Sequence, residues 1–202
     1  MNRTKYLLQD LARSEVMVTI ERHHLDSSSQ IPATTEEVLA SWRDRPAELM
    51  SLMCLVSMRG DEVIAYRQWS AAEAGMSQGR SWPPGSDSYR LRRGVIFDDD
   101  RPIGCVVVST FEFRSSEDAR RWTDLMGEAL ASHRPPVPGL LGQFLHVRDT
   151  SVLNCSAWAE VADHVAFVDT PFAGDRWQRI QDFPGLVHGP GARCRIEAVR
   201  RK

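Results

Sequence analysis

The chain has 202 residues, of which 42% are hydrophobic and 26% are charged, and its formal net charge is −2. This composition is typical of a globular protein with enough apolar side chains for a core, and the length allows one large domain or two of about 100 residues. The Lys and Arg residues are spread along the chain and cluster only at Arg200, Arg201 and Lys202, so no basic groove for nucleic acid is expected.

Membrane insertion and secretion are also not expected. No apolar run approaches the ~20 residues that cross a bilayer, and residues 1–13 form a short amphipathic stretch without a signal-peptide hydrophobic region. We therefore expect a cytoplasmic protein that binds neither nucleic acid nor membrane.

The potential metal ligands do not form local pairs. The four cysteines are far apart in apolar segments, which is typical of buried thiols; they are Cys54, Cys105, Cys155 and Cys194. His23 and His24 are adjacent, and on a strand they would point to opposite faces, so they cannot chelate one ion together. We expect no metal site.

In the first half, apolar and β-branched runs predict four strands, at residues 16–21, 49–58, 63–69 and 89–97. Thr34 or Thr35 can cap a helix that runs to about Asp44, with acidic residues in its first turn. Residues 27–32 are predicted as a loop, residues 59–62 as a tight hairpin turn, residues 70–76 as a short helix start, and residues 78–88 as a loop.

The second half predicts a similar order. Strands are expected at residues 103–113, 140–147, 152–158 and 194–199. Ser115 or Ser116 can cap a helix over residues 118–132. A further helix is expected at residues 160–169, followed by a turn at 176–181, and Gly189-Pro190-Gly191 is expected to form a loop before the last strand.

Each half is thus strand, helix, strand, strand, helix, strand, the order of the ferredoxin-like split unit. The two hairpins align without a gap at an offset of 89 residues, the difference between Trp69 and Trp158. The other matches are Leu52 with Leu141, Val56 with Leu145, Arg59 with Arg148, Val63 with Val152, and Ile64 with Leu153. We predict an α+β fold with two ferredoxin-like repeats, residues 1–98 and 99–202, packed sheet to sheet.

The predicted strand at residues 152–158 carries the most informative set of side chains. Side chains alternate between the faces of a strand, so Asn154, Ser156 and Trp158 share one face, opposite an apolar set. A face with an amide, a hydroxyl and an indole suits a partly apolar pocket with a few directed hydrogen-bond donors.

The second half contains the stretches Pro138-Gly139-Leu140-Leu141-Gly142, Phe144-Leu145-His146 and Val152-Leu153-Asn154-Cys155-Ser156-Ala157-Trp158. These three stretches resemble the antibiotic biosynthesis monooxygenase family. In the first half, Val63-Ile64-Ala65-Tyr66-Arg67-Gln68-Trp69 is similar. The resemblance implies a dimeric α+β barrel of ferredoxin-like units, here within one polypeptide, which would be a monomeric pseudo-dimer or a homodimer of it.

The resemblance also implies a reaction. Well-known members oxidise phenols or anthrones of aromatic polyketides to quinones with molecular oxygen, without metal, flavin or haem, and a hydroquinone-type intermediate would fit the same chemistry. The family's pocket amide and indole correspond to Asn154 and Trp158, whereas Ala65 replaces the amide in the first half.

Chemical roles follow for these side chains. Asn154 can stabilise an enolate oxygen, the Trp158 N–H can hold a carbonyl or peroxide oxygen, and His164 can relay the proton because histidine ordinarily titrates near ~6.5. The remaining candidates would contact the small aromatic substrate; they are Ser156, His146, Trp69, Arg67, Arg176 and Arg179.

Other functions stay open. A non-catalytic ligand-binding protein or a polyketide cyclase would use the same pocket without oxidation. Haem-binding relatives carry a histidine where this chain has Val168 and Gly79, which disfavours haem. The use of reduced flavin as a cofactor also stays open, because reduced flavin can bind such barrels without a Gly-rich phosphate loop.

Overall fold

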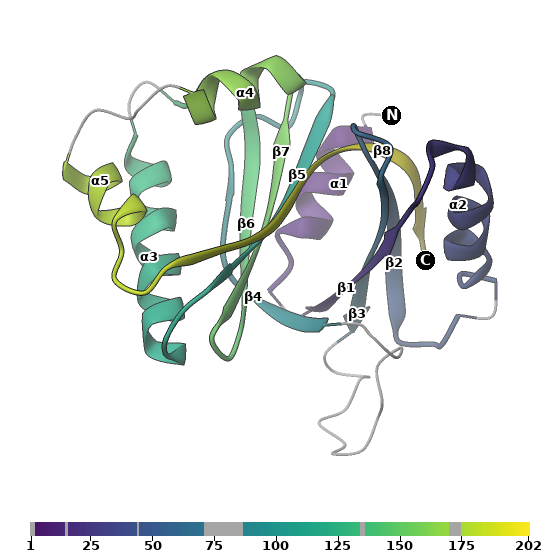
Figure 1. The fold of residues 1–202 in the computed structure, drawn as a ribbon, viewed down its shortest axis with the longest axis horizontal. Helices are drawn as coiled ribbons and strands as arrows, with labels where there is room; N and C mark the ends of the chain where they lie inside the picture. The colour runs from purple at the N-terminus through teal and green to yellow at the C-terminus, as the bar shows by residue number, and fades with distance from the viewer. Residues whose placement is uncertain (1–2, 15, 44, 71–86, 134–135, 170–174) are drawn as a thin grey trace. The chain divides into compact units, whose positions relative to one another are not determined.

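The computed structural model describes residues 3–14, 16–43, 45–70, 87–133, 136–169 and 175–202 (Figure 1). The chain divides into two compact units. Unit 1 contains Met1–Ser14 and Leu91–Arg193, and unit 2 contains Glu15–Arg90 and Cys194–Lys202. Two strands, β4 (Asp87–Ile96) and β8 (Val187–Arg201), contribute residues to both units.

Unit 2 is an antiparallel sheet covered by one described helix. Its elements are β1 (Val16–His24), a 3₁₀ turn (Ser28–Gln30), α2 (Ile31–Ala40), β2 (Leu49–Ser57), β3 (Glu62–Ser70), the start of β4 and the end of β8. The strand order is β4-β1-β3-β2-β8, and α2 packs on β2 and β3. The helix start predicted at residues 70–76 lies, apart from Ser70, outside the described residues, as does most of the loop predicted at 78–88.

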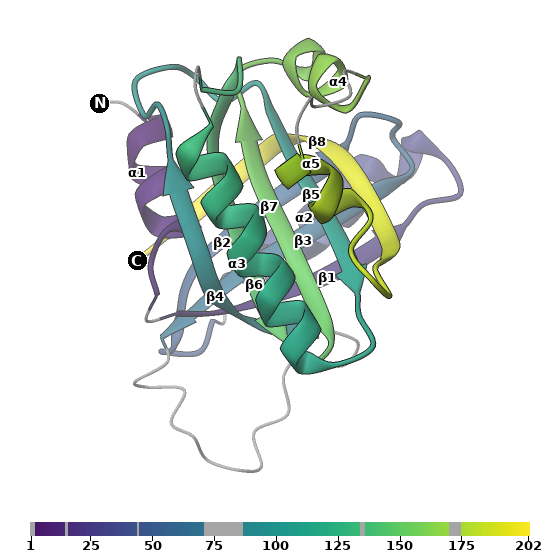
Figure 2. The same ribbon diagram turned by 90° about the vertical axis from the view of Figure 1, so that its left-hand side faces the viewer.

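Unit 1 has the same kind of sheet. Its elements are α1 (Arg3–Leu11), the end of β4, β5 (Cys105–Glu112), α3 (Ser116–Ser132), β6 (Leu140–Arg148), β7 (Ser151–Trp158), α4 (Val161–Asp169), α5 (Asp175–Gln181) and the start of β8. The strand order is β8-β5-β7-β6-β4. Helix α3 lies along β6 and β7 in both ribbon views (Figures 1 and 2), and α5 packs against α3.

The α+β, ferredoxin-like fold predicted from the sequence is confirmed. The first four strands of unit 2 have the order β4-β1-β3-β2, and the corresponding strands of unit 1 have the order β8-β5-β7-β6, which is the arrangement of split βαββαβ units. The duplication, its boundary at residue 98 and the sheet-to-sheet packing stay predictions.

Each unit has its own core between helix and sheet. In unit 1, Trp122 of α3 is only 1% exposed and packs with Val107, Leu145 and Trp158. In unit 2, Val38 of α2 belongs to a cluster with apolar residues of β2 and β3. Burying a large apolar side chain stabilises a fold by ~1.5–3 kcal/mol, so these clusters hold the helices on their sheets. All four cysteines are buried and unbridged, as predicted.

Helix α2 begins earlier than predicted. It starts at Ile31 with Pro32 in its first turn, so Thr34 and Thr35 lie inside it and do not cap it. The cap precedes the helix: Ser27 and Gln30 form a reciprocal capping box on the 3₁₀ turn. The Pro32 ring suits a first helical turn because its missing N–H would have no helical partner there.

The Gly189-Pro190-Gly191 segment is not the predicted loop, because it lies inside β8. Gly189 and Gly191 approach β5 so closely that a Cβ at Gly189 would be 2.4 Å from Thr110 Oγ1. The glycines therefore allow strand contact where the sequence pattern indicates a chain break.

The gapless alignment of the hairpins is wrong for their first strands. Leu52 pairs with Arg67, whereas Gln143 pairs with Ser156. The second strands differ by 156 − 67 = 89 residues, but the first strands differ by 143 − 52 = 91 residues. The turns cause the shift, because residues 58–61 separate β2 from β3 and only residues 149–150 separate β6 from β7. Gln143, not Leu141, is therefore the counterpart of Leu52.

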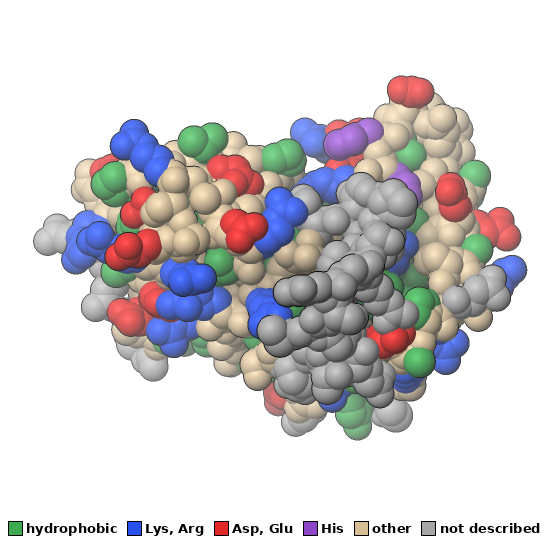
Figure 3. All heavy atoms as spheres, turned by 90° about the horizontal axis from the view of Figure 1, so that it is seen from below, with side chains coloured by type: hydrophobic (Ala, Val, Ile, Leu, Met, Phe, Trp, Pro, Cys, Tyr) green, Lys and Arg blue, Asp and Glu red, His purple; other side chains and the backbone are tan. Residues whose placement is uncertain are grey.

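No helix of the described residues is long and apolar enough to span a membrane. Among the described residues that are visible in Figure 3, basic and acidic side chains are interspersed.

Candidate functional site

A row of three polar side chains crosses the helix-covered face of the unit 1 sheet. Gln143 Nε2 of β6 donates to Asn154 Oδ1 of β7 at 3.0 Å, and Asn154 Nδ2 donates to Ser109 Oγ of β5 at 3.2 Å. The pairing places them in line, because Asn154 lies opposite Ser109 and Gln143 lies opposite the next inward residue of β7, Ser156. The Asn154 amide is thereby fixed in orientation from both sides.

Gln143 Oε1 is a buried acceptor with no hydrogen-bond partner within the described residues. An unsatisfied buried polar atom costs about 1–3 kcal/mol, and most native structures avoid it. An orphaned acceptor beside a fixed amide suits a ligand that brings a hydroxyl donor.

Trp158 lies at the end of the same face and is 2% exposed. Its Nε1 donates to Ser156 Oγ at 2.9 Å. The one donor of the indole is therefore used within the chain, and its role toward a substrate oxygen stays a prediction. The ring contacts Phe167 of α4 at 5.1 Å between centroids and His164 at 5.0 Å.

His164 of α4 is held by an arginine. Arg193 Nε of β8 donates to His164 Nδ1 at 2.8 Å. Burial and, to a smaller extent, the charge of Arg193 lower the pKa of His164 to about 4. A pKa this low leaves His164 neutral at pH 7 and makes it a weaker base than an ordinary histidine, and its role as a proton relay stays a prediction.

The Pro138-Gly139 entry of β6 helps to position α4. Gly139 has φ +73°, a conformation that favours glycine, and a Cβ there would lie 2.1 Å from Asp163 Cγ. The Gly139 carbonyl accepts from the Ala159 N–H at 2.8 Å. This close approach fixes the start of the helix that carries His164.

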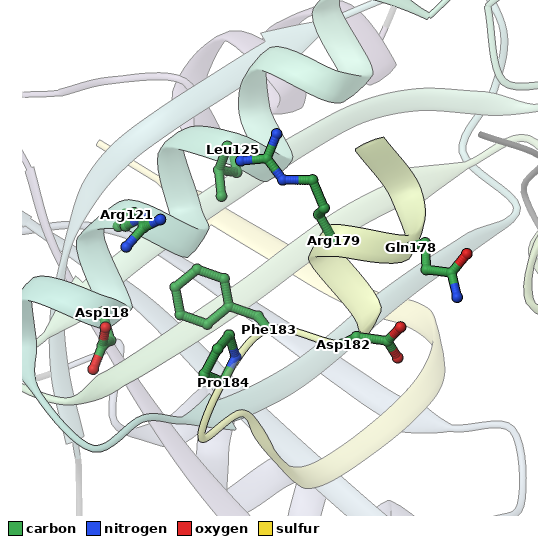
Figure 4. A pocket seen from close by; sticks show the side chains of 8 residues that line it. All are labelled: Asp118, Arg121, Leu125, Gln178, Arg179, Asp182, Phe183 and Pro184. Atoms are coloured by element: carbon green, nitrogen blue, oxygen red, sulfur yellow. The ribbon is translucent and has the colours of Figure 1, made fainter. Parts of the chain in front are cut away.

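Two predicted contacts, His146 and Arg179, do not join this row. His146 pairs with Leu153 and so lies on the opposite sheet face; it is fully buried, and burial lowers its pKa to about 4. Arg179 lines a surface pocket of about 370 Å³ between α3 and α5 with Arg121, Leu125 and Phe183 (Figure 4). The residues that line this pocket do not include Asn154 or Trp158. The side chain of Arg176 lies outside the described part.

Trp69 and Arg67 form a separate cluster in unit 2. Trp69 Nε1 donates to Thr19 Oγ1 at 2.9 Å, and Arg67, 5% exposed, donates from Nη1 to Glu21 Oε2 at 2.8 Å. Strand pairing makes Leu52, Ala65 and Glu21 the counterparts of the unit 1 row. Unit 2 therefore has Leu52 and Ala65 where unit 1 has the two linked amides, with the Arg67–Glu21 ion pair beside them.

Among the described residues, no three His, Cys, Asp or Glu side chains lie close enough together to hold a metal ion.

Comparison with known proteins establishes the fold. No protein-family model matches the sequence, and no curated protein matches it. An anthrone oxidase-like protein of solved structure is similar, with a TM-score of 0.68, 16% identity, and coverage of 95% of this chain and 94% of the other. A candidate monooxygenase from Fusobacterium nucleatum has a TM-score of 0.58, 9% identity and coverage of 94% and 95%.

A ferredoxin-fold protein from Listeria monocytogenes, related to antibiotic biosynthesis monooxygenases, has a TM-score of 0.54, 13% identity and coverage of 91% and 96%. The similarity extends over nearly the whole of each chain, so these proteins share the α+β architecture of this one. At such identities it establishes the fold and not the reaction.

Sequence reasoning missed Gln143, Ser109 and Arg193. Gln143 and Ser109 each interrupt an apolar strand, which was the available signal. Their alignment with Asn154 depends on strand pairing between segments far apart in the chain, and Arg193 is 29 residues from His164, so local patterns did not connect them.

Proposed function

We propose that this protein is a cofactor-independent monooxygenase that oxidises a phenolic, anthrone or hydroquinone-type aromatic polyketide intermediate to a quinone with O₂. The observation that supports it is the linked row of Gln143, Asn154 and Ser109 beside Trp158 and beneath the helices of unit 1. The fold similarity to an anthrone oxidase-like protein is consistent with the proposal.

The reaction balances without an added reductant. For anthrone, C₁₄H₁₀O and O₂ give the quinone C₁₄H₈O₂ and one water, so one oxygen atom enters the ring and the other leaves as water. The deprotonated substrate gives an electron to O₂, the resulting radicals combine to a peroxide, and loss of water forms the second carbonyl.

In this reaction the chain binds, orients and stabilises charge. Asn154 Nδ2 has a second N–H besides the one given to Ser109, and it can donate to the substrate oxygen as that oxygen becomes an enolate or phenolate. Hydrogen bonds to the charged form lower a phenol's pKa, so a fixed amide favours the reactive anion. Gln143 Oε1 would accept from a neighbouring hydroxyl.

Oxygen uptake with anthrone tests the proposal. We expect uptake of one O₂ per anthrone above the rate of the protein-free solution, and no return of O₂ when catalase is added, because water and not peroxide is the product. Gln143→Leu should slow the reaction by about tenfold or more, while Ser132→Ala, at the end of α3, should not.

A non-catalytic binding protein or a cyclase is the second candidate. It is favoured by one observation, that the polar atoms of Asn154 and Trp158 already have partners within the chain. Under anaerobic conditions, binding of anthrone would quench the tryptophan fluorescence. Such binding, together with no oxygen uptake in an aerobic assay, would support that candidate and contradict the monooxygenase. The haem alternative stays less favoured, because Val168, which is 57% exposed and has no ligating atom, stands where the resemblance implies a histidine ligand.

A further inference from the structure

We propose that Arg193 is a positioning residue that holds His164 in the tautomer with its proton on Nε2, so that His164 serves the site as a hydrogen-bond donor rather than as a proton relay. The tautomer follows from contacts within unit 1 alone. The donor role toward substrate rests on the proposed function.

The tautomer follows from the chemistry of the two groups. An arginine side chain has donors and no acceptor, and it stays charged in proteins. Arg193 Nε lies 2.8 Å from His164 Nδ1, so Nδ1 must present its lone pair. In a neutral imidazole the proton is then on Nε2.

The surroundings oppose the doubly protonated ring. A second proton would place an N–H on Nδ1 against the guanidinium donor, in a position where the ring packs against Trp158 and Phe167. The centroid distances are 5.0 Å and 6.4 Å, with the Trp158 ring nearly perpendicular at 80°. Burial and the Arg193 charge act together to lower the pKa of His164.

Two segments far apart in sequence are required for this arrangement. His164 lies on α4, whose start is fixed by the Gly139–Asp163 approach, and Arg193 is the last β8 residue of unit 1. The neutral ring therefore gains a defined orientation beside Trp158, the end of the face that carries the amide row. A donor fixed in advance stabilises developing negative charge without reorganisation.

The tautomer is tested directly by ¹⁵N-edited NMR of the His164 imidazole in the full-length protein. We expect a proton on Nε2, an unprotonated Nδ1, and no titration of His164 between pH 5 and 8. A proton on Nδ1, or a midpoint near 6.5, would overturn the proposal whatever the enzyme activity.

The Arg193 variants separate positioning from general stability. In Arg193→Leu, His164 should populate both tautomers and its titration midpoint should rise, while Arg193→Lys should restore the Nε2 tautomer in part. An unchanged His164 spectrum in Arg193→Leu would contradict the positioning role, even if that variant were less stable.

The donor role is tested with two His164 variants. His164→Gln keeps an N–H near the position of Nε2 but cannot relay a proton, whereas His164→Leu has no donor. We expect His164→Gln to retain anaerobic anthrone binding within about threefold, and His164→Leu to weaken it by about tenfold or more. Equal weakening in both would overturn the donor role. Absence of oxygen uptake by the wild-type protein, with these binding results intact, would reject the proposed reaction alone.

Discussion

At the scale of single residues, the site is built from side chains that orient one another. Gln143 and Ser109 fix Asn154, Ser156 binds the Trp158 indole, and Arg193 binds His164. These internal bonds limit the motion of the donors, which is the property that a preorganised polar site requires. They also make each member's contribution depend on its partner.

The Ser156–Trp158 bond should therefore be visible in stability. Ser156→Ala leaves the buried indole N–H without an acceptor, and we expect it to lower the free energy of unfolding by about 1–3 kcal/mol in urea titrations. In a Trp158→Phe background the same change should cost much less, because there is no N–H to satisfy. An equal loss of unfolding free energy on Ser156→Ala in both backgrounds would show that the Ser156–Trp158 bond makes no specific contribution to stability.

The buried His146 predicts a loss of stability in acid. Its pKa is lowered from 6.5 to about 4 by burial, so above pH 6.5 it is neutral in both the folded and the unfolded chain. As the pH falls from 6.5 to 4, the unfolded chain takes up the proton first, and stability falls by about 3 kcal/mol. Below pH 4 this contribution changes no further.

Urea titrations across pH 4–7.5 measure this effect. His146→Gln should flatten the profile, because the buried imidazole whose pKa burial lowers is then absent. Profiles of equal slope for the wild type and His146→Gln would show that His146 is not buried in its neutral form.

At the scale of elements, the end of β7 is packed against the start of β5. Gly104 N donates to the Trp158 carbonyl at 3.0 Å, and a Cβ at Gly104 would lie 2.2 Å from the Ala159 carbonyl oxygen. The neighbouring atom is backbone, so a rotamer change cannot relieve the clash.

Gly104→Ala should consequently destabilise the protein by about 1–3 kcal/mol and disturb Trp158. Gly191→Ala is a matched control, since its Cβ would lie 3.3 Å from Ser109 Cβ. Urea midpoints and tryptophan emission compare the two variants. A midpoint for Gly104→Ala no lower than that of Gly191→Ala would contradict this contact.

The elements themselves were largely predictable. Ser115 caps α3 as expected, and the strands of both hairpins lie within one or two residues of their predicted limits, because periodicity and capping are local properties. The beginning of β8 was missed since Gly189, Pro190 and Gly191 resemble a loop until a partner strand is present. The start of α2 was missed because an earlier capping box precedes it.

At the scale of the whole molecule, the two units have the same strand order but different polar chemistry. Unit 1 has the amide row, and unit 2 has Leu52 and Ala65 at the corresponding positions, with the Arg67–Glu21 ion pair beside them. The face of Asn154, Ser156 and Trp158 was predictable from alternation along one strand. The position of Gln143 next to these residues was not predictable, because a two-residue difference in turn length hides the equivalence of the hairpins.

The most direct test of the central claim compares the two units in one assay, oxygen uptake with anthrone. If the amide row of unit 1 is the active site, Asn154→Ala and Trp158→Phe should each lower the rate by about tenfold or more, and Trp69→Phe in unit 2 should change it by less than about twofold. Loss of activity in Trp69→Phe equal to that in Asn154→Ala, or full activity in all three variants, would contradict the assignment of the active site to unit 1.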